Sequence, residues 1–222
     1  MAIQVQGNSG VTAEVGGTSV RALNTHGKPI EYQALGHYRI ALRINSTAAQ
    51  AANSKLLELR NPSTNLIIPT RLTLRAMQTV AGTAQENSID VFKVTSFTVL
   101  DTTNTVTPVP VVKRTTAMPA GASAQAQIRH LTLAGAAAGM TGGTMTKDAN
   151  ALSTFPYMVS AAAATGTTGQ WGPYEVFDDV NGTHPLVLLQ NEGIILENRV
   201  LNVTTYGITW YLDFCWAECT SY

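Results

Sequence analysis

Large apolar side chains occupy every second position of segment 208–216, near the C-terminus. They are Ile208, Trp210, Leu212, Phe214 and Trp216. Because successive side chains on a β-strand point to opposite faces of the sheet, a period of two places all five on one face. This segment is therefore predicted to form a long strand whose apolar face covers a core, with Trp210 and Trp216 inside that core.

Segments 38–44 and 72–76 show the same period of two, with arginines at or beside the intervening positions. Both are predicted to be half-buried strands. The arginines of their polar faces are Arg39, Arg43, Arg71 and Arg75. In the simpler interpretation these are solvated faces with cross-strand ion pairs to Glu58 or Glu197. In the alternative, the guanidinium groups form a row that binds carboxylates of a neighbouring subunit.

Shorter runs rich in Val, Ile, Thr and aromatic residues are also typical of strands. They span residues 89–100, 127–133, 174–177, 186–189 and 193–203. Only Ser46–Leu59 suggests a helix, because alanine-rich sequence there follows two residues that can cap a helix. Many short strands with almost no helical periodicity predict an all-β fold, and we favour a jelly-roll-like β-sandwich.

Tracts rich in alanine, glycine and threonine separate the predicted strands, and we expect them to be long loops. They cover Ala117–Ala126, Ala134–Thr146 and Ala161–Gly169. Loops of this length are uncommon in a compact domain unless they are disordered or have a function. We therefore expect either disorder in the isolated chain or wrapping around a neighbouring subunit.

Residues 1–35 differ from the rest of the chain, because they begin with a polar stretch and lack a clean period. We predict an N-terminal arm or docking strands here, followed by a β-sandwich domain at residues 36–222. Val5, Val11 and Val15 are candidate interface residues, since an extended arm can add a strand to the sheet of a partner. The alternative is an ordinary N-terminal hairpin of the same domain.

The chain carries little charge. Charged residues make up 13% of the 222 residues, against about 25% in an average soluble domain. The 14 basic and 14 acidic side chains cancel, so nucleic acid and anionic membranes are not expected partners. Low charge fits either a Thr/Ser/Asn-rich surface or a subunit with many protein contacts.

No segment approaches the roughly 20 apolar residues of a membrane span, and we expect synthesis and assembly in the cytosol.

No catalytic, cofactor or metal motif stands out. Cys215 and Cys219 would lie about 13 Å apart on one strand, at roughly 3.3 Å per residue, which is too far for a disulfide. The four histidines are scattered, and segment 178–184 is interpreted as a polar turn and not a calcium loop. Asp213 and Glu192 could in principle form an acid–base pair, but nothing in the sequence brings them together. We expect a protein without catalytic activity and without a cofactor.

Two aromatic residues of a glycine- and proline-containing segment are further interface candidates. Trp171 and Tyr174 flank the Gly172–Pro173 pair. An exposed aromatic residue there could anchor a protein interface or stack on a sugar ring. The alternative is that Trp171 caps the open end of the sandwich.

Three stretches of the chain resemble virion structural proteins of tailed bacteriophages. They are Ala2–Gly10 with Ala13–Val15, the segment Gly36–Arg39, and His184–Leu188 through Asn191–Gly193 to Trp216–Glu218. The resemblance covers both ends of the chain and includes no active-site motif. It therefore implies a structural role and transfers no catalytic residue.

This resemblance leaves two functional hypotheses. In the first, the chain is a capsid cement or decoration protein that bridges coat subunits, with the major capsid protein or other virion proteins as partners. We would then expect a homotrimer located in the virion and assembled in the host bacterial cytoplasm. In the second, the chain is a tail or fibre component that binds a host-surface receptor or glycan, with Trp171 at the site.

Overall fold

Every regular element that the structure describes is a β-strand. The computed structural model describes residues 3–6, 12–15, 34–46, 50–103, 105–106, 111–113, 124–131, 139–161, 169–178, 185–200 and 207–220. Within these ranges no helix is present and the strands form two large antiparallel sheets that pack as a sandwich. The predictions of an all-β fold and of a β-sandwich are confirmed.

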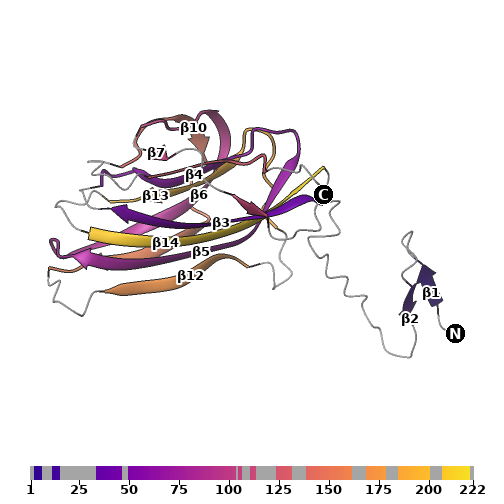
Figure 1. Cartoon of the computed structure of the whole chain (residues 1–222), viewed down its shortest axis with the longest axis horizontal. Helices are drawn as coiled ribbons and strands as arrows, with labels where there is room; N and C mark the ends of the chain where they lie inside the picture. Colours follow the sequence, from indigo (N-terminus) through magenta and orange to yellow (C-terminus); the bar gives the residue numbers. More distant parts are fainter. Residues whose placement is uncertain are drawn as a thin grey trace.

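The first large sheet has five strands in the order β12-β5-β14-β3-β8 (Figure 1). Their bounds are β12 Gln170–Asp178, β5 Leu66–Val80, β14 Gly207–Cys219, β3 Ala34–Ser46 and β8 Val112–Lys113. The predicted C-terminal strand, β14, lies in the middle and pairs with β5 and β3 along its length. Pairing on both sides buries nearly all of β14; only Tyr211 is exposed and Asp213 partly exposed, both on the face turned away from the core.

The second large sheet has seven strands, six of them in the order β10-β6-β13-β4-β9-β7, and β11 also pairs with β6. Their bounds are β10 Thr144–Lys147, β6 Gln85–Val99, β13 Gly193–Asn198, β4 Lys55–Arg60, β9 Gln127–Leu131, β7 Thr105–Val106 and β11 Ser153–Val159. This strand order establishes a sandwich but not the jelly-roll topology that we favoured.

Aromatic side chains fill the space between the two sheets. Trp210 and Trp216 are 1% and 0% exposed, which confirms that both lie in the core. Trp216 stacks between two rings, with centroids 5.3 Å from Phe214 and 5.8 Å from Tyr38. Trp210 meets the Tyr157 ring edge to face at 5.0 Å. Each large aromatic side chain removes about 150–250 Å² from water when it is buried, so these rings contribute strongly to the core.

A second, smaller apolar cluster lies on the opposite face of the seven-stranded sheet. Its buried members are Phe92, Val94, Phe97, Leu100 and Ile195. Ile195 belongs to this cluster, whereas its neighbours Ile194 and Leu196 belong to the main core. β13 is consequently buried on both faces, with all six residues inaccessible.

The predicted helix at Ser46–Leu59 is wrong. Ser46 ends β3, and Lys55–Arg60 form β4, which is hydrogen-bonded between β13 and β9. Leu56, Leu57 and Leu59 are at most 1% exposed. Pairing on both sides and burial of these leucines outweigh the weak helical preference of the alanines before them.

Two other predictions, one of a strand and one of a loop, differ from the structure. The run 186–189 contributes an isolated bridge between Leu188 and Ile67 instead of a strand. Of the predicted loop 134–146, the structure describes residues 139–146, in which Met140 bridges to Lys55 and β10 begins at Thr144. Most of the other two alanine-rich tracts lies outside the described residues.

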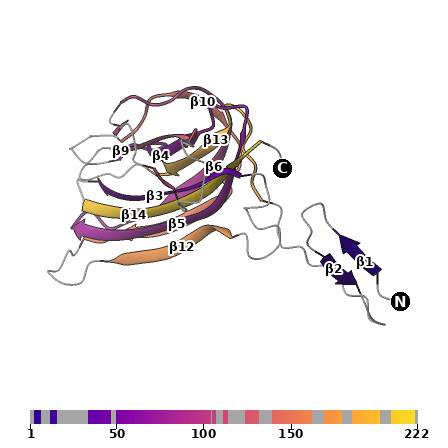
Figure 2. The ribbon, with the colours of Figure 1, turned by 45° about the vertical axis from the view of Figure 1, so that its right-hand side comes forward.

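At the N-terminus, β1 (Ile3–Gln6) and β2 (Thr12–Val15) form a two-stranded antiparallel sheet. In both ribbon views this pair lies apart from the two large sheets (Figures 1 and 2). Val5 pairs with Ala13, and Val15 with Ile3. Val11 lies outside the described residues. The division into an arm at 1–35 and a sandwich at 36–222 stays a prediction, although β3 already begins at Ala34.

Candidate binding face on the five-stranded sheet

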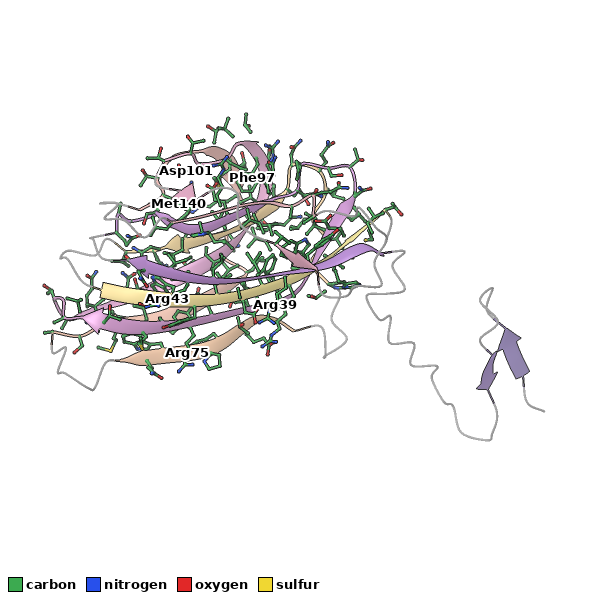
Figure 3. The ribbon with its side chains drawn as sticks, in the orientation of Figure 1. Arg39, Arg43, Arg75, Phe97, Asp101 and Met140 are labelled. Atoms are coloured by element: carbon green, nitrogen blue, oxygen red, sulfur yellow. The ribbon has the colours of Figure 1, made fainter. Side chains whose placement is uncertain are left out.

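The outward face of the five-stranded sheet, turned away from the core, carries all four arginines singled out in the sequence. Three cross-strand rows pass through β3, β14 and β5 on this face. From β3 across β14 to β5, the rows are Arg43, Tyr211 and Arg75; Ala41, Asp213 and Thr73; and Arg39, Cys215 and Arg71. The arginines therefore occupy the four corners of a patch, called the arginine face below, with Asp213 in its middle row. Figure 3 labels three of the corners, Arg39, Arg43 and Arg75.

Two corners of the arginine face are neutralised. Arg39 donates to both oxygens of Asp213, through Nε and Nη2, at 2.7 Å each. This hydrogen-bonded carboxylate raises the pKa of Arg39 above its ordinary value. Arg71 forms a longer ion pair with Glu175 of β12, with 3.4 Å between Nε and Oε1.

The predicted ion pairs of these arginines with Glu58 or Glu197 are wrong. Both carboxylates belong to the seven-stranded sheet, where Glu58 contacts Lys55 and Glu197 contacts Lys147. Strand order decides the outcome, because a cross-strand pair needs adjacent strands and β14 and β12 are the neighbours of β3 and β5.

The other two corners carry uncompensated positive charge. Within the described part of the chain, Arg43 makes no ion pair or hydrogen bond, and the Arg75 guanidinium donates only to the neutral side-chain oxygen of Gln170, at 2.9 Å. Both are cross-strand neighbours of Tyr211, which is 38% exposed. An exposed aromatic residue therefore lies between two arginine positions.

A shallow hollow of about 390 Å³ lies on this face, and Arg43, Arg75 and Tyr211 contribute to its lining. Its floor includes Ala41 and Thr73, whose small side chains leave room beside the larger tyrosine. Guanidinium groups bind carboxylate and phosphate oxygens through paired hydrogen bonds. The hollow can therefore accept an acidic group, with the tyrosine ring as a contact for its apolar part.

A bulge in β12 places Pro173 at one side of this hollow. Pairing with β5 shifts register between Trp171 and Tyr174. Gly172 between them has a φ of +90°, and a Cβ there would lie 2.7 Å from the carbonyl oxygen of Leu74. Only glycine fits this conformation and this close approach.

Trp171 and Tyr174 occupy different environments on β12. The half-buried Trp171 ring meets Tyr157 edge to face, with centroids 6.2 Å apart, and packs against the main core. Tyr174 meets Phe155 at 4.5 Å but stays 43% exposed. Of the two predicted interface residues, Tyr174 thus presents more of its ring to solvent.

A buried charge cluster on the seven-stranded sheet was missed by sequence reasoning. Lys55, Glu58 and Asp101 have side chains that are 6%, 0% and 0% exposed. Glu58 stands between two leucines in an apolar strand, and a carboxylate in such a run is the signal that could have revealed the cluster. Tyr211 was also not singled out, because its place between two arginines depends on strand order.

The remaining predictions about reactive groups concern separate places. Glu192 pairs with Lys93, at 3.1 Å, in the seven-stranded sheet, whereas Asp213 lies on the arginine face. Cys215 and Cys219 are buried and are not joined in a disulfide, and burial raises the pKa of Cys219. In the described ranges no group of three or more metal-ligating side chains gathers. In the same ranges, no helix is long and apolar enough to cross a membrane.

Comparisons with models of known protein families, with curated proteins and with solved structures found no match for this chain. The fold itself defines the class, an antiparallel two-sheet β-sandwich with an arginine-bearing outer face.

Proposed function

We propose that this chain is a structural protein of a bacteriophage particle, a capsid cement or decoration subunit that bridges coat proteins. The observation that carries the proposal is the arginine face, where Arg43 and Arg75 flank an exposed tyrosine without a carboxylate partner among the described residues. In a chain with only 13% charged residues, two uncompensated cations on one sheet face favour an acidic protein surface as partner.

The chemistry of the arginine face suits repeated weak contacts. An acidic coat segment would place one carboxylate near Arg43 and another near Arg75, and its apolar part against Tyr211. Each contact lies at the surface and is screened by salt. On a lattice, however, several contacts of one oligomer form at the same time. The oligomer as a whole then binds much more tightly than any single contact would. A homotrimer with the major capsid protein or other virion proteins as partners fits this requirement.

The N-terminal arm is the second part of the proposal. The β1–β2 pair lies apart from the sandwich (Figure 2), and Val5, Val11 and Val15 are its candidate contact residues. Strand addition to a coat subunit would use backbone hydrogen bonds and needs no charge. The arm and the arginine face would then bind two different coat subunits.

Binding to particles tests the proposal. Purified protein is mixed with heads or coat lattices that lack it, and bound protein is measured by co-sedimentation at low and high salt. We expect stoichiometric binding that Arg43→Glu with Arg75→Glu weakens at least about tenfold at low salt. The control is Arg199→Glu, because Arg199 lies in the segment after β13 of the other sheet, with its side chain 67% exposed and a long ion pair to Asp90, at 3.9 Å. Absence of binding by the wild-type protein would overturn the proposal.

A second function has one observation in its favour. An exposed tyrosine with an arginine at each cross-strand neighbouring position also suits an acidic sugar, which can stack on the ring and present a carboxylate to an arginine. The chain would then be a tail or fibre component that binds a host-surface glycan. Gold-labelled antibody on intact particles separates the two, because a cement protein labels heads and a receptor binder labels tails. Tyr211→Ala should abolish cell attachment only in the second case.

A further inference from the structure

The amine of Lys55 meets two carboxylates in the interior of the second sheet. Its Nζ lies 2.7 Å from Oε1 of Glu58 and 3.6 Å from Oδ2 of Asp101. The three side chains are 6%, 0% and 0% exposed. One cation thus faces two anionic groups in a place from which bulk water is excluded, and one carboxylate has no counter-charge of its own.

Backbone groups hold the two carboxylates in place. Asp101 Oδ1 accepts a hydrogen bond from Thr103 N at 2.7 Å, and Oδ2 accepts one from Gly142 N at 2.6 Å. Glu58 Oε2 accepts from the backbone N–H of Asp101 at 2.9 Å. Lys55 Nζ also donates to the carbonyl oxygen of Gly142. Each reactive group is therefore fixed by at least one contact that does not involve the other two side chains.

We propose that Lys55 and Asp101 condense to an isopeptide bond, with Glu58 as the group that moves the proton. Transfer of one proton from the Lys55 ammonium to the Asp101 carboxylate gives a neutral amine and a carboxylic acid. The Nζ lone pair then attacks Cγ of Asp101. Glu58 takes the next proton from nitrogen and returns it to the departing hydroxyl. One N–Cγ bond forms, one Cγ–O bond breaks, and one water molecule leaves; no oxidant or further reactant is needed.

Three features of the cluster favour this step. The amine and the acid are held within contact distance, which replaces a bimolecular encounter by an intramolecular one. The N–H groups of Thr103 and Gly142 each donate to one oxygen of Asp101, so the oxygen that carries negative charge when Cγ becomes tetrahedral has a donor whichever oxygen leaves. The product also replaces a buried ion pair by a neutral amide and leaves Glu58 as one hydrogen-bonded carboxylate.

The bond would join β4 to the segment that follows β6, close to where Met140 bridges to Lys55 (Figure 3). It would close a covalent loop across the seven-stranded sheet and hold the segments at Asp101 and Gly142, which flank the second apolar cluster, against that sheet. This inference does not depend on the proposed function, although a shell protein under mechanical load would benefit from such a link.

The mass of the denatured full-length protein tests whether the isopeptide bond forms. We expect an intact mass lower by one water molecule than the sequence requires, and a branched peptide containing Lys55 and Asp101 after proteolysis. Asp101→Ala and Lys55→Arg should each restore the full sequence mass. Glu58→Gln should do so as well, since it keeps the shape of the side chain and removes the proton acceptor.

Two measurements on the wild-type protein test the proposal even if a variant fails to fold. They are its intact mass and a search for a branched peptide at a second lysine–carboxylate contact. Lys147 and Glu197 are also in contact, at 2.5 Å, but the lysine side chain is 35% exposed, and no branched peptide should contain them. An intact wild-type mass equal to the sequence mass would overturn the proposal and identify the cluster as an ordinary buried ion network.

Discussion

Asp213 binds the guanidinium of Arg39 with both carboxylate oxygens, across neighbouring strands and between residues 174 positions apart in the chain. Because both carboxylate oxygens of Asp213 are bound to Arg39, this arginine is less available to other partners than Arg43 or Arg75. It also places a negative charge beside the hollow, where an acidic ligand would approach.

Removal of that charge should strengthen binding of acidic ligands. Asp213→Asn frees Arg39 and eliminates a like-charge repulsion. We expect a glutamate-rich peptide to bind several-fold more tightly to this variant at low salt, with the difference shrinking as salt rises. Fluorescence anisotropy of a labelled peptide measures the effect. Glu86→Gln, an exposed change on β6 of the other sheet, serves as control; an equal gain in this variant would contradict the assignment.

Gly193→Ala should destabilise the fold severely. A Cβ at this position would lie 1.9 Å from the Leu59 carbonyl oxygen and 2.5 Å from the Phe97 ring. Because the backbone of a strand paired on both sides cannot retreat, we expect a loss of about 3 kcal/mol or more in the free energy of unfolding. Urea denaturation gives the value. Met158→Ala, at a side chain 58% exposed, should stay within about 0.5 kcal/mol of wild type.

The two core tryptophans should respond differently to replacement by phenylalanine. Trp216 Nε1 donates to Glu218 Oε1 at 3.0 Å, whereas Trp210 Nε1 is buried without a hydrogen-bond partner in the described part of the chain. Trp216→Phe removes a donor from a buried carboxylate and should lower the free energy of unfolding by about 1 kcal/mol more than Trp210→Phe. Equal losses in urea denaturation would contradict this reading of the core.

Stability should fall at alkaline pH. Burial raises the pKa of Cys219 above its ordinary value of 9.0, and burial with the nearby Glu218 carboxylate raises that of Tyr38 above 10.0. The unfolded chain then loses these protons first, so the free energy of unfolding is highest below the ordinary values and decreases as pH rises through the raised ones. Urea midpoints measured from about pH 7 to about pH 11 follow the decrease. Tyr38→Phe with Cys219→Ala should flatten this curve; an unchanged slope would assign the effect to other groups.

The fold was most predictable where one face of a strand is buried and the other is not. β14, β3 and β5 carry a period of two for that reason. β13 carries no such period, because the second apolar cluster covers its other face. Its composition indicated a strand but did not indicate which face of the strand would be buried. β4 was mistaken for a helix because its partners come from distant segments, which local preference does not reveal.

The candidate site was predictable in part. The sequence placed Arg39, Arg43, Arg71 and Arg75 on polar strand faces and offered a row of guanidinium groups as one interpretation. The partner of Arg39 and the position of Tyr211 required the strand order, which a single sequence does not contain. The buried lysine cluster likewise depends on contacts between β4 and a segment more than 40 positions later, as the separation of 43 between Asp101 and Glu58 illustrates.

The contrast between the two sheets has a consequence for how such a chain can change over generations. Each residue of β13 is enclosed by neighbours above and below, so almost any replacement there disturbs a packed interior. On the first sheet, by contrast, Arg43, Tyr211 and Arg75 are exposed on the face turned away from the core, so their replacement need not disturb the packed interior. Descendants of this chain are thus free to acquire new partners through one sheet while the other keeps the architecture constant.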